Sequence, residues 1–267
     1  MSLKVKDLMR IMEEYAPLNY KEDFDNVGLM VGDEESEVTS ILVSLDCTMD
    51  VVEEGKEKGC NFILTHHPLL FLKPKTITKS TLQGRKIIEL IKNDINLYSS
   101  HTNLDSTKDG INDLITKLLD FDSWEVIDEK PYEEKVGIGR MVTLSSLVTL
   151  EDLCNKVKSA LNIPTLKYSG GENTIIKKVA IINGSGNDFL FKAKELGADC
   201  IITGDTTYHY VSDLNEEGVC VIDIGHFESE WPGMQLVGVW LQNKLKLMGY
   251  DNRVYISEKS FSPYKYK

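Results

Sequence analysis

The chain has 267 residues and a mass of 30.2 kDa, and its 30 lysine and arginine residues against 42 aspartate and glutamate residues give a formal charge of −12. Apolar residues make up 42% and charged residues 27% of the chain, which excludes a disordered, collagenous or coiled-coil protein. The length predicts one large domain or two small ones. The acidic balance argues against a broad nucleic-acid-binding surface, although a local basic patch stays open.

The sequence has no apolar run long enough to span a membrane. Charged residues interrupt its N-terminal segment at helical spacing, unlike a secretory signal. The cysteines are widely spaced, odd in number and without a CxxC pair: Cys47, Cys60, Cys154, Cys200 and Cys220. This pattern is typical of reduced thiols, so we expect a cytoplasmic protein.

The first half of the chain alternates helices and strands. Apolar residues at i, i+3, i+4 and i+7 predict a helix over 3–16, which Pro17 ends. The elements predicted after it are two short apolar strands (VGLMVG and ILVSLD), a helix over 48–58, the buried strand NFILTHH, a polar loop over 72–80, a helix over 82–93, the strand INLYSSH and a helix over 110–119. This alternation predicts a mostly parallel sheet covered on both faces.

The polar, charged segment 121–135 is the best candidate for a domain boundary. The elements predicted beyond it are the strand VGIGRMVTL, a helix over 149–161, the strands TLKYS and KKVAIING, a helix over 186–196, the strand CIITGD, a helix over 206–216, the strand VCVIDIGH, a long amphipathic helix and the strand RVYIS. Ser229 is expected to cap the long helix with Pro232 in its first turn, and Gly249 to end it. The sequence thus predicts two α/β layers, each on a mixed sheet.

Histidines gather at the ends of predicted strands. His66 and His67 end NFILTHH, His101 ends INLYSSH, and His226 ends VCVIDIGH. In open α/β sheets, functional groups cluster outside the carboxyl ends of strands, because the loops there converge on a crevice. Adjacent histidines on an extended strand point to opposite faces, so two ions are easier to ligate than one unless the strand ends there.

Carboxylates accompany these histidines. Asp105 follows His101 in HTNLD, and both Glu228 and Glu230 follow His226 in GHFESE. Imidazole and carboxylate ligands together suit Zn²⁺, Mn²⁺, Fe²⁺, Co²⁺ or Ni²⁺, and two such ions bridged by a carboxylate would activate water. A lone histidine is more often a hydrogen-bonded structural residue, but three such motifs at strand ends favour a metal site.

Two further features leave alternatives open. His209 is predicted to lie on a helix at i+4 from Asp205, where it could be a surface residue or support the site. The glycine-rich turn 184–188 (GSGND) could hold an anion or could be glycine-rich for steric reasons alone. The sequence contains neither a P-loop nor a GxSxG nucleophile elbow.

Five motifs cover essentially the whole chain: DNVGLMVG (25–32), ILTHHPLLF (63–71), SSHTNLD (99–105), IITGDTTYH (201–209) and GHFESE (225–230). In this order they resemble the Nif-three-like family, whose members are often labelled GTP cyclohydrolase 1 type 2 homologues. The resemblance implies two three-layer α/β domains with mixed sheets, a dinuclear metal site in the inter-domain cleft, and a toroidal homohexamer. Longer members carry an inserted central domain, for which this chain is too short. The implied domains are 1–125 plus 231–267, and 126–230.

The resemblance also implies roles for particular residues. It places Glu230 as the bridge between the ions, and His101 and His209 near them as candidate catalytic residues. Asp25 and Asn26 of the first motif would lie near the site. The implied metal ligands are His66, His67, Asp105, His226 and Glu230.

Three functions stay open at this point. The favoured one is a metal-dependent hydrolase acting on a nucleotide or another phosphorylated or cyclic small molecule, with His101, His209 or a metal-bound hydroxide as general base. The second is a non-catalytic metal carrier, sensor or scaffold, which would use the same ligands without turnover. The third is a nucleic-acid or protein partner role for the ring, which the acidic charge disfavours.

Overall fold

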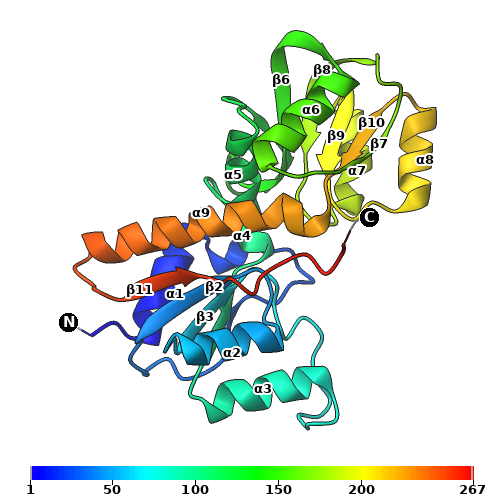
Figure 1. Cartoon of the computed structure of the whole chain (residues 1–267). Coiled ribbons are helices and arrows are strands. Elements are labelled where there is room, and N and C mark those ends of the chain that lie inside the picture. Colours follow the sequence, from blue (N-terminus) through cyan, green and yellow to red (C-terminus); the bar gives the residue numbers. More distant parts are fainter. Residues whose placement is uncertain (1, 266) are drawn as a thin grey trace. The chain divides into compact units, whose positions relative to one another are not determined.

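The computed structural model describes residues 2–265 and 267. The chain forms two compact units, Met1–Leu104 with Met234–Lys267, and Asp105–Gly233. The helices α4 (Thr102–Ser106) and α9 (His226–Leu247) contain residues of both units. Each unit is a three-layer α/β domain on a mixed sheet, as predicted (Figure 1). Over the described residues, no helix combines the length and the apolar character that a membrane span needs.

The first unit is built on a sheet with the strand order β1-β4-β3-β2-β11. The last four of these strands run parallel, and β1 pairs antiparallel with β4. The elements of this unit, besides α9, are α1 (Val5–Tyr15), η1 (Leu18–Tyr20), β1 (Gly28–Val31), β2 (Ser40–Ser44), α2 (Met49–Glu57), β3 (Phe62–Thr65), α3 (Leu82–Lys92), β4 (Asn96–Ser99) and β11 (Arg253–Ile256).

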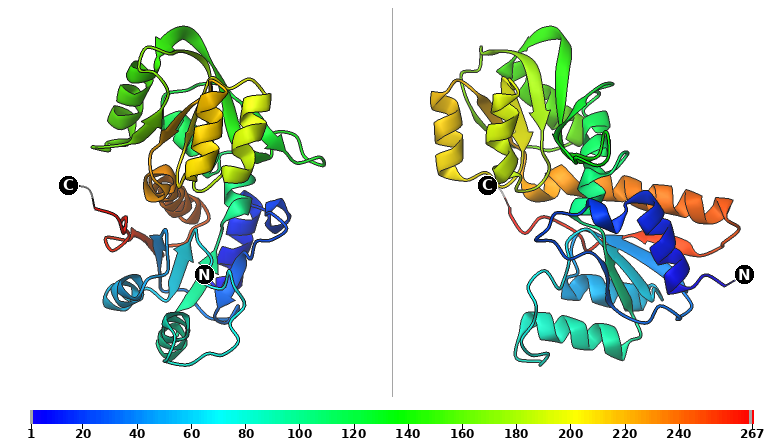
Figure 2. Two further views of the ribbon diagram at one scale, coloured as in Figure 1. Left: turned by 90° about the vertical axis from the view of Figure 1, so that its right-hand side faces the viewer. Right: turned by 180° about the vertical axis from the view of Figure 1, so that it is seen from behind.

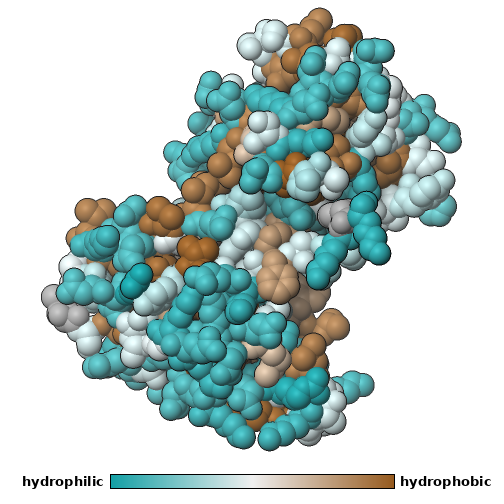
Figure 3. Space-filling view, viewed as in Figure 1, coloured by the Kyte–Doolittle hydropathy of each residue, from teal (hydrophilic) through white to brown (hydrophobic). Residues whose placement is uncertain are grey.

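Helices cover both faces of this sheet. Leu42 and Ile63 face α2 and α3, whereas the next residue, Val43, faces Gly238 of α9, because successive strand residues point to opposite sides. Figure 2 shows α1 on the face opposite to α2 and α3. The outer side of α2 is charged and exposed, and hydrophilic residues cover this part of the unit in Figure 3. The central strands β2, β3 and β4 are therefore buried on both faces, as a parallel sheet requires.

The second unit has the strand order β5-β6-β8-β9-β10-β7. Strands β8, β9 and β10 run parallel, and the other neighbours pair antiparallel. The elements of this unit, besides the start of α9, are α5 (Ile111–Leu118), β5 (Glu125–Glu129), β6 (Gly137–Thr149), α6 (Leu150–Leu161), β7 (Lys167–Ser169), β8 (Ile175–Ile181), α7 (Asn187–Glu195), β9 (Cys200–Thr203), α8 (Tyr208–Glu216) and β10 (Cys220–Asp223).

The two faces of the second sheet are covered by different helices. Leu190 of α7 and Leu214 of α8 pack with Ile201 in one core cluster. On the opposite face, Arg140 of β6 forms a buried ion pair with Asp113 of α5, and Figure 2 shows α6 on the side away from α7 and α8. The sheet is thus the middle of three layers.

The limits of the two units differ from the predicted domain boundaries, which fall after residues 125 and 230. The segment 105–125 belongs to the second unit, since Asp113 of α5 is tied to Arg140 of β6. The predicted polar linker also contains the strand β5, which pairs with β6. In β5 only Ile127 is buried and acidic residues surround it, so the alternation typical of a strand is almost invisible in the sequence.

The prediction that Ser229 caps the long helix is wrong. The helix α9 begins at His226, and Pro232 lies beyond its first turn. It can begin there because Gly225 before it adopts a φ of 90°, which favours glycine. The hydroxyl of Ser229 instead donates to the carbonyl of His226 and accepts from the N–H of Gly184.

Candidate metal centre

Three neighbouring parallel strands of the first unit end at the same level. Their last residues are aligned in the pairings of β2 with β3 and of β3 with β4. Asp46 follows β2, His66 and His67 follow β3, and His101 follows β4. The ring centroids of the histidines lie between 5.0 and 5.7 Å apart, and one nitrogen of each lies within 4.8 Å of the others. The three rings therefore form one cluster at the carboxyl edge of the sheet.

Both adjacent histidines reach this cluster because β3 ends at Thr65. The alternation of a strand no longer applies to His66 and His67, and their ring centroids lie 5.2 Å apart. The turn is held by two hydrogen bonds, from the N–H of His67 to the carbonyl of Leu45 and from Oγ1 of Thr65 to the carbonyl of His67, both 3.0 Å long. Because the strand ends before the two histidines, a single ion could contact both rings.

An oxygen atom orients each of these rings through Nδ1. The Nδ1–oxygen distances are 2.9 Å from His66 to the Ser100 carbonyl, 2.9 Å from His67 to Asp46 Oδ1, and 2.8 Å from His101 to Asp25 Oδ1. A carbonyl or ionised carboxylate oxygen can only accept, so Nδ1 carries the proton and Nε2 of the neutral ring has the lone pair that ligates metals. Histidine ligands of metals in proteins are oriented in this way.

Among these acceptors, the Asp25 carboxylate has a lowered pKa and receives hydrogen bonds on both oxygens. Burial would raise its pKa, but hydrogen bonds from His101 and Thr102 outweigh that effect and lower the pKa of Asp25 to about 2. Thr102 donates its backbone N–H and its hydroxyl to Oδ2, at 3.0 and 2.5 Å. The carboxylate is therefore ionised at neutral pH and holds the His101 ring in one tautomer. The next residue, Asn26, donates its side-chain amide to the carbonyl of Leu70 at 2.9 Å.

The second unit repeats this arrangement at the ends of β9 and β10, which are also parallel neighbours. Asp205 follows β9, and His226 follows β10 as the first residue of α9. Oδ2 of Asp205 lies 2.9 Å from Nδ1 of His226, and Oε2 of Glu230, one turn along α9, lies 3.1 Å from Nε2 of His226. An imidazole nitrogen and a carboxylate oxygen, both capable of binding metal, thus lie side by side within this unit.

Gly184, which follows β8, makes room for the Glu230 carboxylate. A Cβ atom built on Gly184 would lie 2.2 Å from Oε1 of Glu230, and Gly184 adopts a φ of 59°. Its N–H donates to the Ser229 hydroxyl at 2.9 Å. The glycine-rich turn therefore has a steric role beside a candidate ligand.

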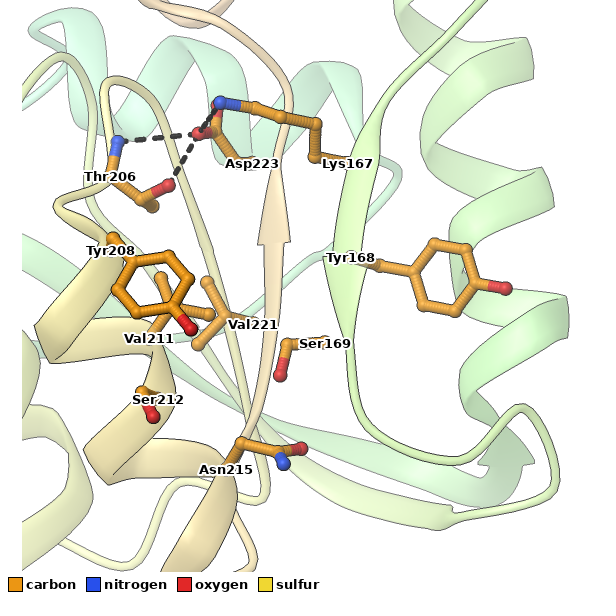
Figure 4. Close-up of a pocket in the computed structure, with 10 residues that line it drawn as sticks. All are labelled: Lys167, Tyr168, Ser169, Thr206, Tyr208, Val211, Ser212, Asn215, Val221 and Asp223. Atoms are coloured by element: carbon orange, nitrogen blue, oxygen red, sulfur yellow. Dashed lines mark hydrogen bonds and ion pairs between the residues drawn. The ribbon is translucent and has the colours of Figure 1, made fainter.

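A pocket of about 420 Å³ lies in the second unit between α8, β7 and β10. Figure 4 shows Lys167 and Thr206 directed at Asp223 at one end of it. Lys167 Nζ lies 2.6 Å from Asp223 Oδ2, which also accepts the Thr206 hydroxyl at 2.6 Å, and Asp223 Oδ1 accepts the Gly225 N–H at 3.0 Å. Burial would raise the pKa of Asp223, but these hydrogen bonds lower it. This carboxylate thus fixes both loops that carry the Asp205–His226 pair.

The other predicted site residues lie on α4, α8 and α9. Asp105 is buried on α4 and is the first residue of the second unit, and its carbonyl accepts the Asn112 side-chain amide at 3.1 Å. His209 is exposed on α8, with its ring centroid 5.3 Å from that of Tyr208. Glu228 is partly buried on α9. The roles expected for Asp105 and His209 stay predictions.

Sequence reasoning missed two carboxylates, Asp46 and Asp205, as partners of His67 and His226. Each lies two residues after the end of a strand, in ILVSLD and IITGD, so the strand-end rule that selected the histidines would also have selected them. The sequence related Asp205 to His209 by helical spacing instead. That spacing does not apply, because α8 begins only at Tyr208.

The ligand chemistry of these residues fits a divalent transition metal. Imidazole nitrogens and carboxylate oxygens suit zinc, iron, manganese, cobalt and nickel. The cysteines are buried and free, and burial raises the pKa of the Cys47 thiol to about 12, so a thiolate ligand is disfavoured. The described part of the chain thus holds a histidine cluster and a histidine–glutamate pair that could bind metal.

Comparison with known proteins places this arrangement in a family. The Duf34/NIF3 (NGG1p interacting factor 3) family matches residues 3–263. A Clostridium acetobutylicum protein described as "GTP cyclohydrolase 1 type 2 homolog" is 53% identical over 269 residues, with 100% of both chains covered. A Staphylococcus aureus protein of the same description is 29% identical over 367 residues, with 99% of this chain and 100% of that protein covered, and is therefore longer than this chain.

A solved structure supports the same assignment. The crystal structure of a Staphylococcus aureus hypothetical protein has a TM-score of 0.92 and 33% sequence identity to this chain, with 100% of both chains covered. The match in sequence and the match in fold both extend over the whole length. The chain therefore belongs to the Duf34/NIF3 family.

Proposed function

We propose that the protein is a metal-dependent hydrolase that uses two divalent ions of zinc, iron, manganese, cobalt or nickel. The substrate class is a nucleotide or another phosphorylated or cyclic small molecule, in keeping with the description of its relatives as GTP cyclohydrolase 1 type 2 homologues. The proposal joins ligands from both units, as the resemblance implies. The geometry within the units supports His66 and His67 in the first and the pair of His226 and Glu230 in the second. The proposed ligands are His66, His67, Asp105, His226 and Glu230.

One observation carries this proposal. His66, His67, His101 and His226 all have Nδ1 within 2.9 Å of an oxygen acceptor, which reserves Nε2 as the metal-binding atom. A structural histidine could use either nitrogen. The consistent use of Nδ1 in two separate sheets leaves Nε2 of each ring as the candidate ligand atom and so supports the proposed metal site.

The chain's own residues supply the proton transfer. Two divalent ions held by the proposed ligands would supply Lewis acidity to water and to a substrate oxygen. The ionised Asp25 holds the Nδ1 proton of His101, so Nε2 of His101 can accept a proton from an attacking water. We propose His101 as the general base and the exposed His209 as a second proton-transfer residue.

Elemental analysis of the untagged protein tests the metal site. We expect about two transition-metal ions per chain in the wild type, and loss of metal in His66→Ala and in Glu230→Gln. Glu228→Gln is the matched control, because it removes a neighbouring carboxylate on the same helix that is not a proposed ligand. Metal content that is the same in all four proteins would overturn the ligand assignment.

A hydrolysis screen of the metal-loaded protein then tests catalysis. We expect turnover of at least one nucleotide, cyclic or phosphorylated compound by the wild type, and none above background by Glu230→Gln. His101→Asn should retain metal but lose most of the turnover, because a general base contributes about 10²–10⁴-fold. Bound metal without turnover of any compound would support the alternative of a non-catalytic metal carrier, sensor or scaffold.

We also propose that the chain assembles into the toroidal homohexamer that the family resemblance implies. Light scattering should then give a mass about six times the 30.2 kDa of the chain. The free, buried state of the cysteines supports a reducing cytoplasmic location, because extracellular proteins tend to pair their cysteines.

A further inference from the structure

Two exposed phenylalanines lie beside the histidine cluster of the first unit. Phe24 and Phe71 are 65% and 45% exposed. Their ring centroids are 6.2 Å apart at an interplanar angle of 70°, and the Phe71 ring is 6.3 Å from that of His101 at 87°. Large apolar rings are usually buried, so a pair left exposed beside a polar site indicates a binding surface.

The segments that position the histidines also carry these rings. Phe24 precedes Asp25, which holds His101, and Phe71 lies four residues after His67. The Asn26 side-chain amide donates to the carbonyl of Leu70 at 2.9 Å and ties the two segments together. The Phe71 N–H donates to the carbonyl of Pro68 at 3.2 Å. The backbone segments that carry the two rings are thus held together before a ligand binds, which lowers the entropic cost of binding.

The charge of the adjacent loop indicates what kind of molecule would bind. Residues 72–80 contain three lysines and no acidic residue, in a chain whose net charge is −12. Anionic groups would be attracted there, and exposed aromatic rings stack planar heterocycles. A substrate with a planar ring and an anionic tail matches both features.

We propose that Phe24 and Phe71 form an aromatic platform that binds the planar ring of an anionic substrate next to His101. The platform rests on the proposed function, since it would present that substrate to the proposed metal site. It narrows the substrate class to compounds with an aromatic heterocycle, and it makes these two side chains specificity residues.

Calorimetric binding of two probes tests the platform. Adenosine 5′-monophosphate and ribose 5-phosphate share the sugar and the phosphate and differ by the heterocycle. We expect metal-loaded wild type to bind the nucleotide about 5- to 150-fold more tightly, which is the effect of stacking one base on aromatic side chains. Phe71→Ala and Phe24→Ala should each reduce this ratio at least threefold, Phe71→Tyr should keep it, and Leu72→Ala, which alters a neighbouring exposed residue, should also keep it.

Metal content measured on the same samples separates this proposal from the proposed function. Equal binding of the two probes by the wild type, binding of neither, or a ratio that survives both alanine substitutions would overturn the platform. Protein without metal would overturn the metal-dependent function, while the ratio measured on that protein would still decide the platform. A ratio lost only together with a change in oligomeric mass would assign the rings to subunit contact and would also overturn it.

Discussion

The substitution Gly184→Ala tests the position of Glu230 most directly. The added Cβ would lie 2.2 Å from Oε1 of Glu230, whereas ordinary contacts begin near 3.4 Å. The carboxylate oxygen must therefore move by about 1 Å, but metal–ligand distances hold within about 0.2 Å. Because this oxygen lies at the end of a flexible side chain, the fold can absorb the movement although a bound metal cannot. We expect metal affinity to fall about 10–100-fold or more.

The Gly184→Ala substitution also has a backbone cost in stability, which the same substitution at a second glycine can measure separately. Gly184 has a φ of 59°, and an alanine in this region costs about 1–2 kcal/mol in the free energy of unfolding. Gly197 lies in the same unit with a φ of 85°, and no atom lies within 4 Å of the point where its Cβ would stand. Gly197→Ala should therefore show the same loss of stability and no loss of metal affinity.

Two measurements separate these effects. Urea unfolding of the metal-free proteins gives the backbone cost without a contribution from bound metal. Competition with a chromophoric chelator then gives the metal affinity of each variant. If Gly184→Ala binds metal as tightly as Gly197→Ala does, Glu230 is not a ligand in this position, and the role of Gly184 is only conformational.

Three further predictions concern contacts around the site and in the cores. Asp113→Asn leaves the buried Arg140 without its counter-charge, and urea titration should show a loss of about 3–5 kcal/mol in the free energy of unfolding. Burial would raise the pKa of Glu54, but hydrogen bonds, chiefly from Lys58, lower it. Ionised Glu54 therefore stabilises the fold above its ordinary pKa of about 4.3, and this stabilisation is lost as the pH falls through the lower folded-state pKa; unfolding of Glu54→Gln should show a smaller loss over that range. Asp223→Asn should weaken metal binding about 10-fold in the chelator assay, and an unchanged affinity would show that Asp223 does not position the ligands.

The fold could be predicted from the sequence where hydrophobic periodicity is strong. The helix over 3–16 and the buried strand NFILTHH have clear patterns, and the structure contains them as α1 and as β3, which ends two residues earlier than predicted. The strand β5 was missed because Ile127 is its one buried residue. The start of α9 was placed late because serine and proline usually mark a helix start, whereas Gly225 allows the helix to begin earlier.

The histidines of the site could be predicted from the sequence, but which carboxylate is hydrogen-bonded to each of them could not. Residue type and position at a strand end were enough to select His67 and His226. The pairing of His67 with Asp46 depends on β2 and β3 being parallel neighbours, and the pairing of His226 with Asp205 depends in the same way on β10 and β9. Sheet order is a tertiary property, and no local pattern encodes it.

The repetition of this pairing in two sheets of different strand order is an argument about function. In each unit, a histidine after one parallel strand receives a carboxylate from the end of the neighbouring strand, at 2.9 Å in both cases. A carboxylate behind an imidazole increases the basicity of the opposite nitrogen. Higher basicity of that nitrogen strengthens metal binding and proton transfer, whereas a histidine with only a structural hydrogen bond does not require it. Two independent sheets with the same device therefore favour reactive nitrogens at both sets of strand ends.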